Sequence, residues 1–125
     1  MIYLSFDIEE FDMPKEYGYD IAFERQIAIS RKGLTAILDL LKKHQMRATF
    51  FSTVVFAQQV PDLINRLIEE GHELASHTYY HSDLENEHLQ RSKEALEQQF
   101  AVPVEGLRMP RMLDVSAEEV KKAGY

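Results

Sequence analysis

Two histidines four residues apart, His77 and His81, are the side chains in this sequence best suited to binding a metal ion. They follow a short apolar run, and if the segment forms one helical turn, both rings project from the same side. Asp7 and Glu9 come at the end of another apolar run, at residues 2–6. Two histidines and a carboxylate bind a divalent metal with positions left open for water and substrate. The pattern predicts a catalytic metal site rather than a structural one.

The composition restricts the ligands and partners that are possible. The chain of 125 residues has no cysteine, so a metal must be bound by His, Asp and Glu. Its formal charge of −7 argues against a nucleic-acid partner, because such affinity is built from clustered Lys and Arg. The longest apolar runs are far shorter than the roughly 20 residues of a transmembrane helix. The first residues do not have the pattern expected of a signal peptide, so a cytoplasmic location is the default expectation.

Hydrophobic patterning predicts strands that alternate with helices. The expected strands span residues 2–6, 48–52, 73–76 and 104–108. The expected helices end near Gln45, Gly71, Phe100 and Gly124; the second begins at Pro61, the third begins at Glu87, and Ser116 caps the fourth. Such alternation is typical of an α/β fold with a parallel sheet and right-handed crossovers.

The residues that could do chemistry follow three of these strands. They are Asp7 and Glu9 after the first strand, His77 and His81 after the third, and Arg108 and Arg111 after the fourth. The carboxyl ends of parallel strands lie at one edge of the sheet, where α/β proteins build their active sites. We therefore expect these side chains to meet there.

These segments resemble the motifs of the polysaccharide deacetylase family, the NodB-homology domain of carbohydrate esterase family 4. Residues 5–9, Ser-Phe-Asp-Ile-Glu, resemble its first motif, usually Thr-Phe-Asp-Asp, with the second acid displaced by one residue. Residues 77–81, His-Thr-Tyr-Tyr-His, match the second motif, His-Ser/Thr-x-x-His. Residues 108–111, Arg-Met-Pro-Arg, match the third, Arg-x-Pro-Tyr, except that arginine replaces tyrosine. The order of the motifs agrees along nearly the whole chain.

The resemblance implies a partial (β/α) barrel, corresponding to the first half of the family's distorted (β/α)7 barrel. We expect one NodB-like domain over residues 1–125, truncated on its C-terminal side. Half of a barrel leaves open strand edges and exposed apolar surface. A homo-oligomer in which a second copy covers the open edge is therefore expected.

The resemblance also implies a role for each residue. Asp7 would be the general base, Arg108 would pair with it and orient it, and the backbone amide of Arg111 would help to hold the oxyanion. The implied metal ligands are Glu9, His77 and His81. The expected metal is Zn²⁺, with Co²⁺ or Ni²⁺ as alternatives; Zn²⁺ lowers the pKa of a bound water to about 7, so that a nearby carboxylate can take its proton.

The expected function is metal-dependent hydrolysis of non-peptide C–N bonds, as N-deacetylation of an N-acetylated polysaccharide or peptidoglycan-type glycan. The histidine that the family uses as the acid for the leaving amine belongs to a Leu-x-His segment that lies beyond the third motif, so low activity of this chain alone is expected. One alternative is a metal-independent cyclic-amide hydrolase that resembles allantoinases. Another is a non-catalytic half-barrel that serves as a glycan-binding or assembly module.

Other polar residues receive structural interpretations. His72 is expected to complement the charge at the end of a helix, and His88 is expected to face solvent. Glu10 and Asp12 are expected to form a solvated acidic loop. Asp83 is expected either to cap a helix or to accept a hydrogen bond from a ligand histidine.

Overall fold

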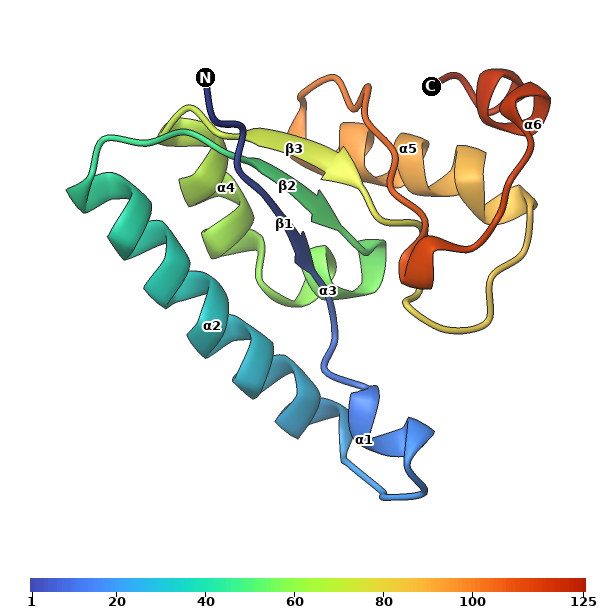
Figure 1. The fold of residues 1–125 in the computed structure, drawn as a ribbon, viewed down its shortest axis with the longest axis horizontal. Helices are drawn as coiled ribbons and strands as arrows, with labels where there is room; N and C mark the ends of the chain where they lie inside the picture. The colour runs from blue at the N-terminus through green and yellow to red at the C-terminus, as the bar shows by residue number, and fades with distance from the viewer.

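Three short parallel strands form the centre of the fold, in the order β1-β2-β3 (Figure 1). The computed structural model describes residues 1–125, and the strands are β1 (Ser5–Ile8), β2 (Thr49–Ser52) and β3 (Glu73–Ser76). Each residue of β1 lies opposite the matching residue of β2, and each residue of β2 opposite the matching residue of β3. The three strands therefore end level with one another, and the segments that follow them begin at a single edge.

Helices join the strands in the predicted α/β order. They are α1 (Met13–Glu16), α2 (Phe23–Lys43), α3 (Val54–Gln59), α4 (Pro61–Glu69), α5 (Glu87–Phe100) and α6 (Ala117–Lys122), with a 3-10 turn, η1 (Pro110–Met112). The helix α4 packs on α2 and on β3 (Figure 1). The helix α5 packs on α3 and on β3. None of the helices is both long and apolar enough to cross a membrane.

The two faces of the sheet carry different side chains, because alternate residues of a strand point to opposite faces. Phe6, Phe50 and Leu74 pack with side chains of α2, α4 and α5 in one core. The opposite face carries Ser5, Asp7, Thr49, Phe51, Glu73 and Ala75. Four of these six residues line an open hollow of about 540 Å³. Helices on one face and a hollow on the other are the arrangement expected of a partial barrel.

The first strand begins later than predicted. Ile2 and Tyr3 are 83% and 87% exposed and lie outside the sheet, because the pairing with β2 starts at Ser5. Asp7 therefore lies inside β1 rather than after it. Its side chain points to the hollow face of the sheet, since Phe6 and Ile8 on either side belong to the core.

The predicted strand at residues 104–108 is wrong except for one parallel bridge, between Ser76 and Leu107. The Ser76 N–H donates to the carbonyl of Gly106 over 2.8 Å, and the Ser76 carbonyl accepts from the Arg108 N–H over 2.9 Å. Gly106 suits this close approach, because a Cβ there would lie 3.1 Å from that of Ala75 and one of the two would have to shift by a few tenths of an ångström. The bridge places Arg108 beside the carboxyl end of β3.

The backbone of Val104 is bound to α5 instead of to β3. Its N–H donates to Glu97 Oε1 over 2.9 Å, and its carbonyl accepts from Lys93 Nζ. Because α5 side chains occupy these two groups, the ladder with β3 cannot extend back along the segment.

The other predicted strands and helices are all present in the structure. The strands β2 and β3, the start of α4 at Pro61 and both ends of α5 are confirmed. Gly71 follows α4 with φ of +83°, and Ser116 caps α6 by accepting from the Glu119 N–H. The helix α2 begins at Phe23, four residues before the first core position that its periodicity marks, and α1, α3 and η1 were not predicted.

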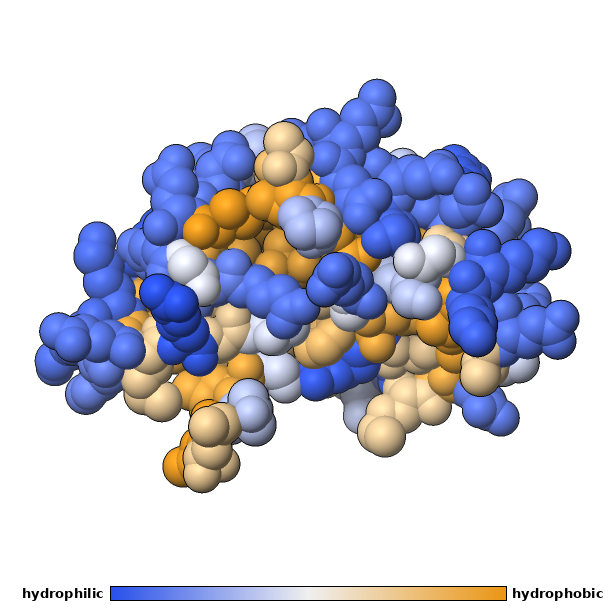
Figure 2. Space-filling view, turned by 90° about the horizontal axis from the view of Figure 1, so that it is seen from above, coloured by the Kyte–Doolittle hydropathy of each residue, from blue (hydrophilic) through white to orange (hydrophobic).

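Hydrophobic side chains interrupt the hydrophilic surface on the face seen from above (Figure 2). Large exposed hydrophobic residues include Ile2, Tyr3, Tyr17, Tyr19 and Met112. The first two line the hollow on the free face of the sheet. This apolar surface is of the kind that mediates contacts with other protein segments.

Candidate metal centre

Glu9, His77 and His81 come together at the carboxyl edge of the sheet. Glu9 directly follows β1 and His77 directly follows β3. Glu9 Oε2 lies 3.0 Å from His77 Nε2 and 3.3 Å from His81 Nε2. One donor atom from each of the three residues lies within 4.8 Å of the other two, which is close enough for a single metal ion.

The two rings converge even though residues 77–81 do not form the helical turn that was assumed. Thr78 adopts a left-handed φ of +67°, and its N–H donates to Ser76 Oγ over 3.2 Å. The rings of His77 and His81 then lie stacked, with their centroids 6.0 Å apart. A tight turn after β3, rather than helical spacing, brings the imidazoles together.

The second nitrogen of each ring already has a hydrogen-bond partner. His77 Nδ1 lies 2.8 Å from the carbonyl oxygen of Arg108, and His81 Nδ1 lies 2.7 Å from Asp12 Oδ1. Because a carbonyl or a carboxylate oxygen only accepts, we assign the hydrogen of each neutral ring to Nδ1. The lone pairs on both Nε2 atoms are thereby directed at Glu9.

Glu9 Oε2 is buried and has no hydrogen-bond donor. Three electron-rich atoms that face one another repel unless a cation or a proton lies among them. Burial of the His77 ring disfavours its charged form, but Glu9, to which the protonated ring would donate, and the charges of Asp7 and Glu9 outweigh this, so the pKa of His77 lies above its ordinary value. The same negative charge attracts a divalent cation, and two imidazoles with a carboxylate suit Zn²⁺ or Co²⁺.

Asp7 is held beside this cluster by Arg108. Arg108 Nη1 donates to Asp7 Oδ1, and Nη2 donates to Ser5 Oγ, both over 2.8 Å. The guanidinium lies 4.1 Å from the ring centroid of Phe51, which fixes its plane. The structure thus brings together Asp7 and Arg108 as the sequence predicted, with one carboxylate oxygen bound by the guanidinium.

Arg111 borders the same site. Its backbone lies at φ of +53°, and its side chain forms an ion pair with Glu16 of α1. The Arg111 N–H takes no part in the backbone hydrogen bonds of the fold. Together with Asp7, the three clustered residues and α1, it lines a cleft of about 280 Å³. All of the predicted site residues except Arg108 line this cleft.

The prediction that Glu10 and Asp12 form a solvated loop is wrong. They are only 7% and 9% exposed, and both carboxylates contact the second histidine of the cluster. Burial raises the pKa of Asp12, but hydrogen bonds from Ser82 and His81, with the charge of Arg111, bring it below its ordinary value. The one signal in the sequence was the density of carboxylates immediately after a buried strand.

His88 is buried rather than facing solvent. It is 8% exposed, and its ring lies 5.9 Å from that of Tyr79 and 5.7 Å from that of Tyr80. Its Nδ1 accepts from the Glu85 N–H over 3.3 Å. The amphipathic pattern of α5 did not reveal this, because the partners of His88 come from the loop before the helix.

His72 and Asp83 also differ from their predictions. His72 is buried, and its Nδ1 accepts from the Ala48 N–H over 3.2 Å, so it acts as a core hydrogen-bond acceptor rather than a charge at a helix end. Asp83 makes neither of its two predicted contacts. The helix α5 has no side-chain cap, and Asp12 takes the place beside a cluster histidine.

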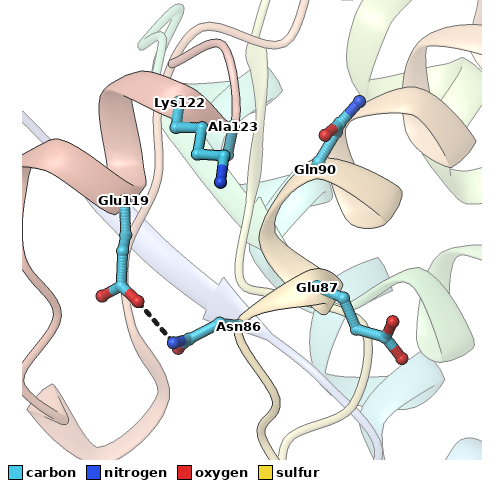
Figure 3. A pocket seen from close by; sticks show the side chains of 6 residues that line it. All are labelled: Asn86, Glu87, Gln90, Glu119, Lys122 and Ala123. Atoms are coloured by element: carbon cyan, nitrogen blue, oxygen red, sulfur yellow. Dashed lines mark hydrogen bonds between the residues drawn. The ribbon is translucent and has the colours of Figure 1, made fainter.

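A second hollow, of about 320 Å³, lies between α5 and α6 (Figure 3). Asn86 donates there to Glu119, and Glu87, Gln90 and Lys122 also line the hollow (Figure 3). The hollow has no histidine and shares no residue with the cleft at the strand ends. The candidate site is therefore the cleft.

Known proteins resemble this chain in both sequence and fold. The family model described as polysaccharide deacetylase matches residues 1–125. Over 48 residues the chain is 46% identical to the peptidoglycan-N-acetylmuramic acid deacetylase PdaA of Bacillus subtilis, a segment that covers 38% of this chain and 18% of that protein.

Solved structures extend the likeness over almost all of the chain. The peptidoglycan N-acetylglucosamine deacetylase Bc1960, solved with a hydroxamate compound, is 26% identical, with a TM-score of 0.67 over 97% of this chain and 50% of its own. BA3943 of Bacillus anthracis, a pseudoenzyme of carbohydrate esterase family 4, is 21% identical, with a TM-score of 0.67 over 98% of this chain and 39% of its own. The chain thus spans half or less of the length of these relatives.

Proposed function

Because this chain belongs to the polysaccharide deacetylase family, we propose that it forms part of a metal-dependent enzyme that removes acetyl groups from an N-acetylated glycan. The observation that carries the proposal is the convergence of His77 Nε2, His81 Nε2 and Glu9 Oε2, three acceptor atoms with no donor among them. The names of the relatives as peptidoglycan deacetylases support a glycan as the substrate.

Each residue of the cleft has a part in this reaction. A divalent metal held by the cluster would supply Lewis acidity toward the substrate carbonyl and toward a water molecule. Asp7 would take the proton of the attacking water, while Arg108 holds its Oδ1 and so keeps the carboxylate oriented. The unused N–H of Arg111 would donate to the oxyanion, a contact worth about 2.7–4 kcal/mol. The proton that Asp7 took from the water would then pass to the amide nitrogen as the C–N bond breaks, so that acetate and a free amine leave.

Acetate release tests the proposal. The protein would be stripped with a chelator and assayed on N-acetylated chito-oligosaccharides with and without added Zn²⁺. We expect activity that returns with Zn²⁺ and is lost in His77→Ala, while His44→Ala at the exposed end of α2 behaves as wild type. Activity that is indifferent to both the metal and His77→Ala would refute the mechanism.

A non-catalytic module is the second candidate. The arginine that replaces the family's tyrosine in the third motif favours it. Metal analysis discriminates between the two candidates. Stoichiometric Zn²⁺, Co²⁺ or Ni²⁺ in the purified protein favours the enzyme, whereas a protein that binds none favours the module or the metal-independent allantoinase-like reaction.

A second copy of the chain is the partner that we propose for the free face of the sheet. Ile2 and Tyr3 are exposed beside the hollow that this face lines, so apolar surface is available for the contact. Sedimentation would show a concentration-dependent dimer that weakens in Ile2→Ser, with Lys43→Ser as the control. A monomer at all concentrations would rule this partner out.

A further inference from the structure

His81 is held at two points by carboxylates outside the three-residue cluster. Its backbone N–H donates to Glu10 Oε1 over 2.9 Å, and its ring Nδ1 lies 2.7 Å from Asp12 Oδ1. The two acids come from the loop that follows β1, so they approach His81 from a segment 69 residues or more away along the chain. No other histidine in the molecule has two such partners.

The contact with Asp12 is built into the fold. Asp12 is 9% exposed, and its second oxygen, Oδ2, accepts from Ser82 Oγ over 2.6 Å. A buried carboxylate is costly unless its oxygens are bound, and here both are. The acid therefore has one available geometry, in which Oδ1 faces the ring of His81.

The backbone of His81 is fixed just as firmly. Glu10 Oε2 accepts from Thr53 Oγ1 over 2.7 Å, and the same threonine oxygen accepts from the Phe56 N–H at the start of α3. The main chain of His81 is thus tied through Glu10 to the end of β2. With the backbone held, the contact with Asp12 determines how the ring is turned.

We propose that Asp12 is a positioning residue for His81, which keeps the hydrogen on Nδ1 and directs the Nε2 lone pair at Glu9 and His77. The inference rests on the proposed function, since the lone pair matters only if His81 binds a metal. A carboxylate in this position sets the tautomer and orientation of a ligand imidazole and makes it a stronger donor. Asp12 acts here through the ring of His81 and is not one of the three proposed metal ligands.

The tautomer of His81 is the direct readout. In the metal-free protein at mildly alkaline pH, two-bond ¹H–¹⁵N correlation spectra should show the hydrogen on Nδ1 of both His77 and His81. In Asp12→Asn the hydrogen of His81 should move toward Nε2, because the amide can donate to Nδ1 and Glu9 can accept from Nε2. His77, bound to the Arg108 carbonyl, should not change, and it serves as a reference in the same spectrum.

Metal affinity is the second readout. Competition with a chromophoric chelator should show that Asp12→Asn binds Zn²⁺ about 10–100-fold more weakly than wild type. Asp20→Asn, which removes an exposed carboxylate from the segment between α1 and α2, should leave the affinity unchanged. Asp12→Glu keeps the carboxylate and should recover the Nδ1–H tautomer and part of the affinity. If Asp12→Asn does not fold, the tautomer and the Zn²⁺ affinity are measured in Asp12→Glu instead.

The outcomes separate this inference from the proposed function. A wild-type protein that binds none of Zn²⁺, Co²⁺ and Ni²⁺ refutes both. A wild type that binds Zn²⁺ together with an Asp12→Asn variant of unchanged tautomer and affinity refutes the role of Asp12 and leaves the metal site intact. The role of Asp12 is also refuted if Asp20→Asn loses as much Zn²⁺ affinity as Asp12→Asn, because the effect would then come from net charge alone.

Discussion

Arg108 and Asp7 are 101 residues apart in the sequence, yet Arg108 Nη1 donates to Asp7 Oδ1 over 2.8 Å. The carbonyl oxygen of the same arginine accepts from His77 Nδ1, also over 2.8 Å. Arg108 therefore contacts the candidate base through its side chain and a candidate metal ligand through its backbone. The two contacts can be separated experimentally, because only the first is lost when the side chain is truncated.

Arg108→Ala should lower the rate of acetate release while the Zn²⁺ content stays near that of wild type. The base loses its partner, and general-base catalysis is worth about 10²–10⁴-fold, so we expect a loss of kcat of at least about 100-fold. Acetate release and metal content would be measured on the same samples, with Arg25→Ala as an exposed control. An unchanged kcat would show that Asp7 needs no partner.

Glu9→Gln should weaken Zn²⁺ binding by more than about 100-fold, because it removes a ligand charge and not merely an outer contact. The variant keeps the size of the side chain, so the fold should persist. Chelator competition gives the affinity, and Glu24→Gln at the exposed start of α2 is the matched control. Equal affinities for Glu9→Gln and wild type would exclude Glu9 as a direct ligand.

The stability of the metal-free protein should depend on pH through His72. Burial lowers the pKa of His72 below its ordinary value of 6.5; Glu70 opposes this and Arg47 adds to it. The unfolded chain then takes up a proton at a higher pH than the folded protein. The free energy of unfolding should therefore fall as the pH is lowered below about 6.5, by at most about 1.4 kcal/mol per pH unit from this group.

Urea denaturation of the metal-free protein at several pH values would measure this slope. In His72→Asn the amide oxygen can still accept from the Ala48 N–H, but the residue no longer titrates. The difference between the two slopes isolates His72 from His77, whose raised pKa acts in the opposite direction. Identical slopes for the two proteins would contradict the assignment.

Leu38→Ala should destabilise the fold by about 2–5 kcal/mol, because Leu38 is fully buried where α2 joins the core. Leu40 lies on the same helix but is 58% exposed, so Leu40→Ala should change the stability by less than about 0.5 kcal/mol. The free energy of unfolding from urea titration checks both variants. Comparable losses would mean that α2 is packed differently.

Local patterns in the sequence predicted most of the regular structure. The ends of α5, the cap at Ser116 and the stop at Gly71 depend on neighbouring residues, so a sequence pattern reveals them. The strand at residues 104–108 failed because its backbone bonds are taken by α5 side chains. That competition depends on the packing of two segments, which no periodicity records.

The sequence by itself determined which residues can form the site. The residue types and the strand ends that carry them pointed to Glu9, His77 and His81, and carboxyl ends of parallel strands must share an edge. Only the tertiary structure decided how the site is held. The tight turn at Thr78 and the contact of Asp12 with His81 arise where the loop after β1 meets the loop after β3. Spacing along a chain sets local geometry, whereas a contact between two loops depends on the paths that both take through the folded protein.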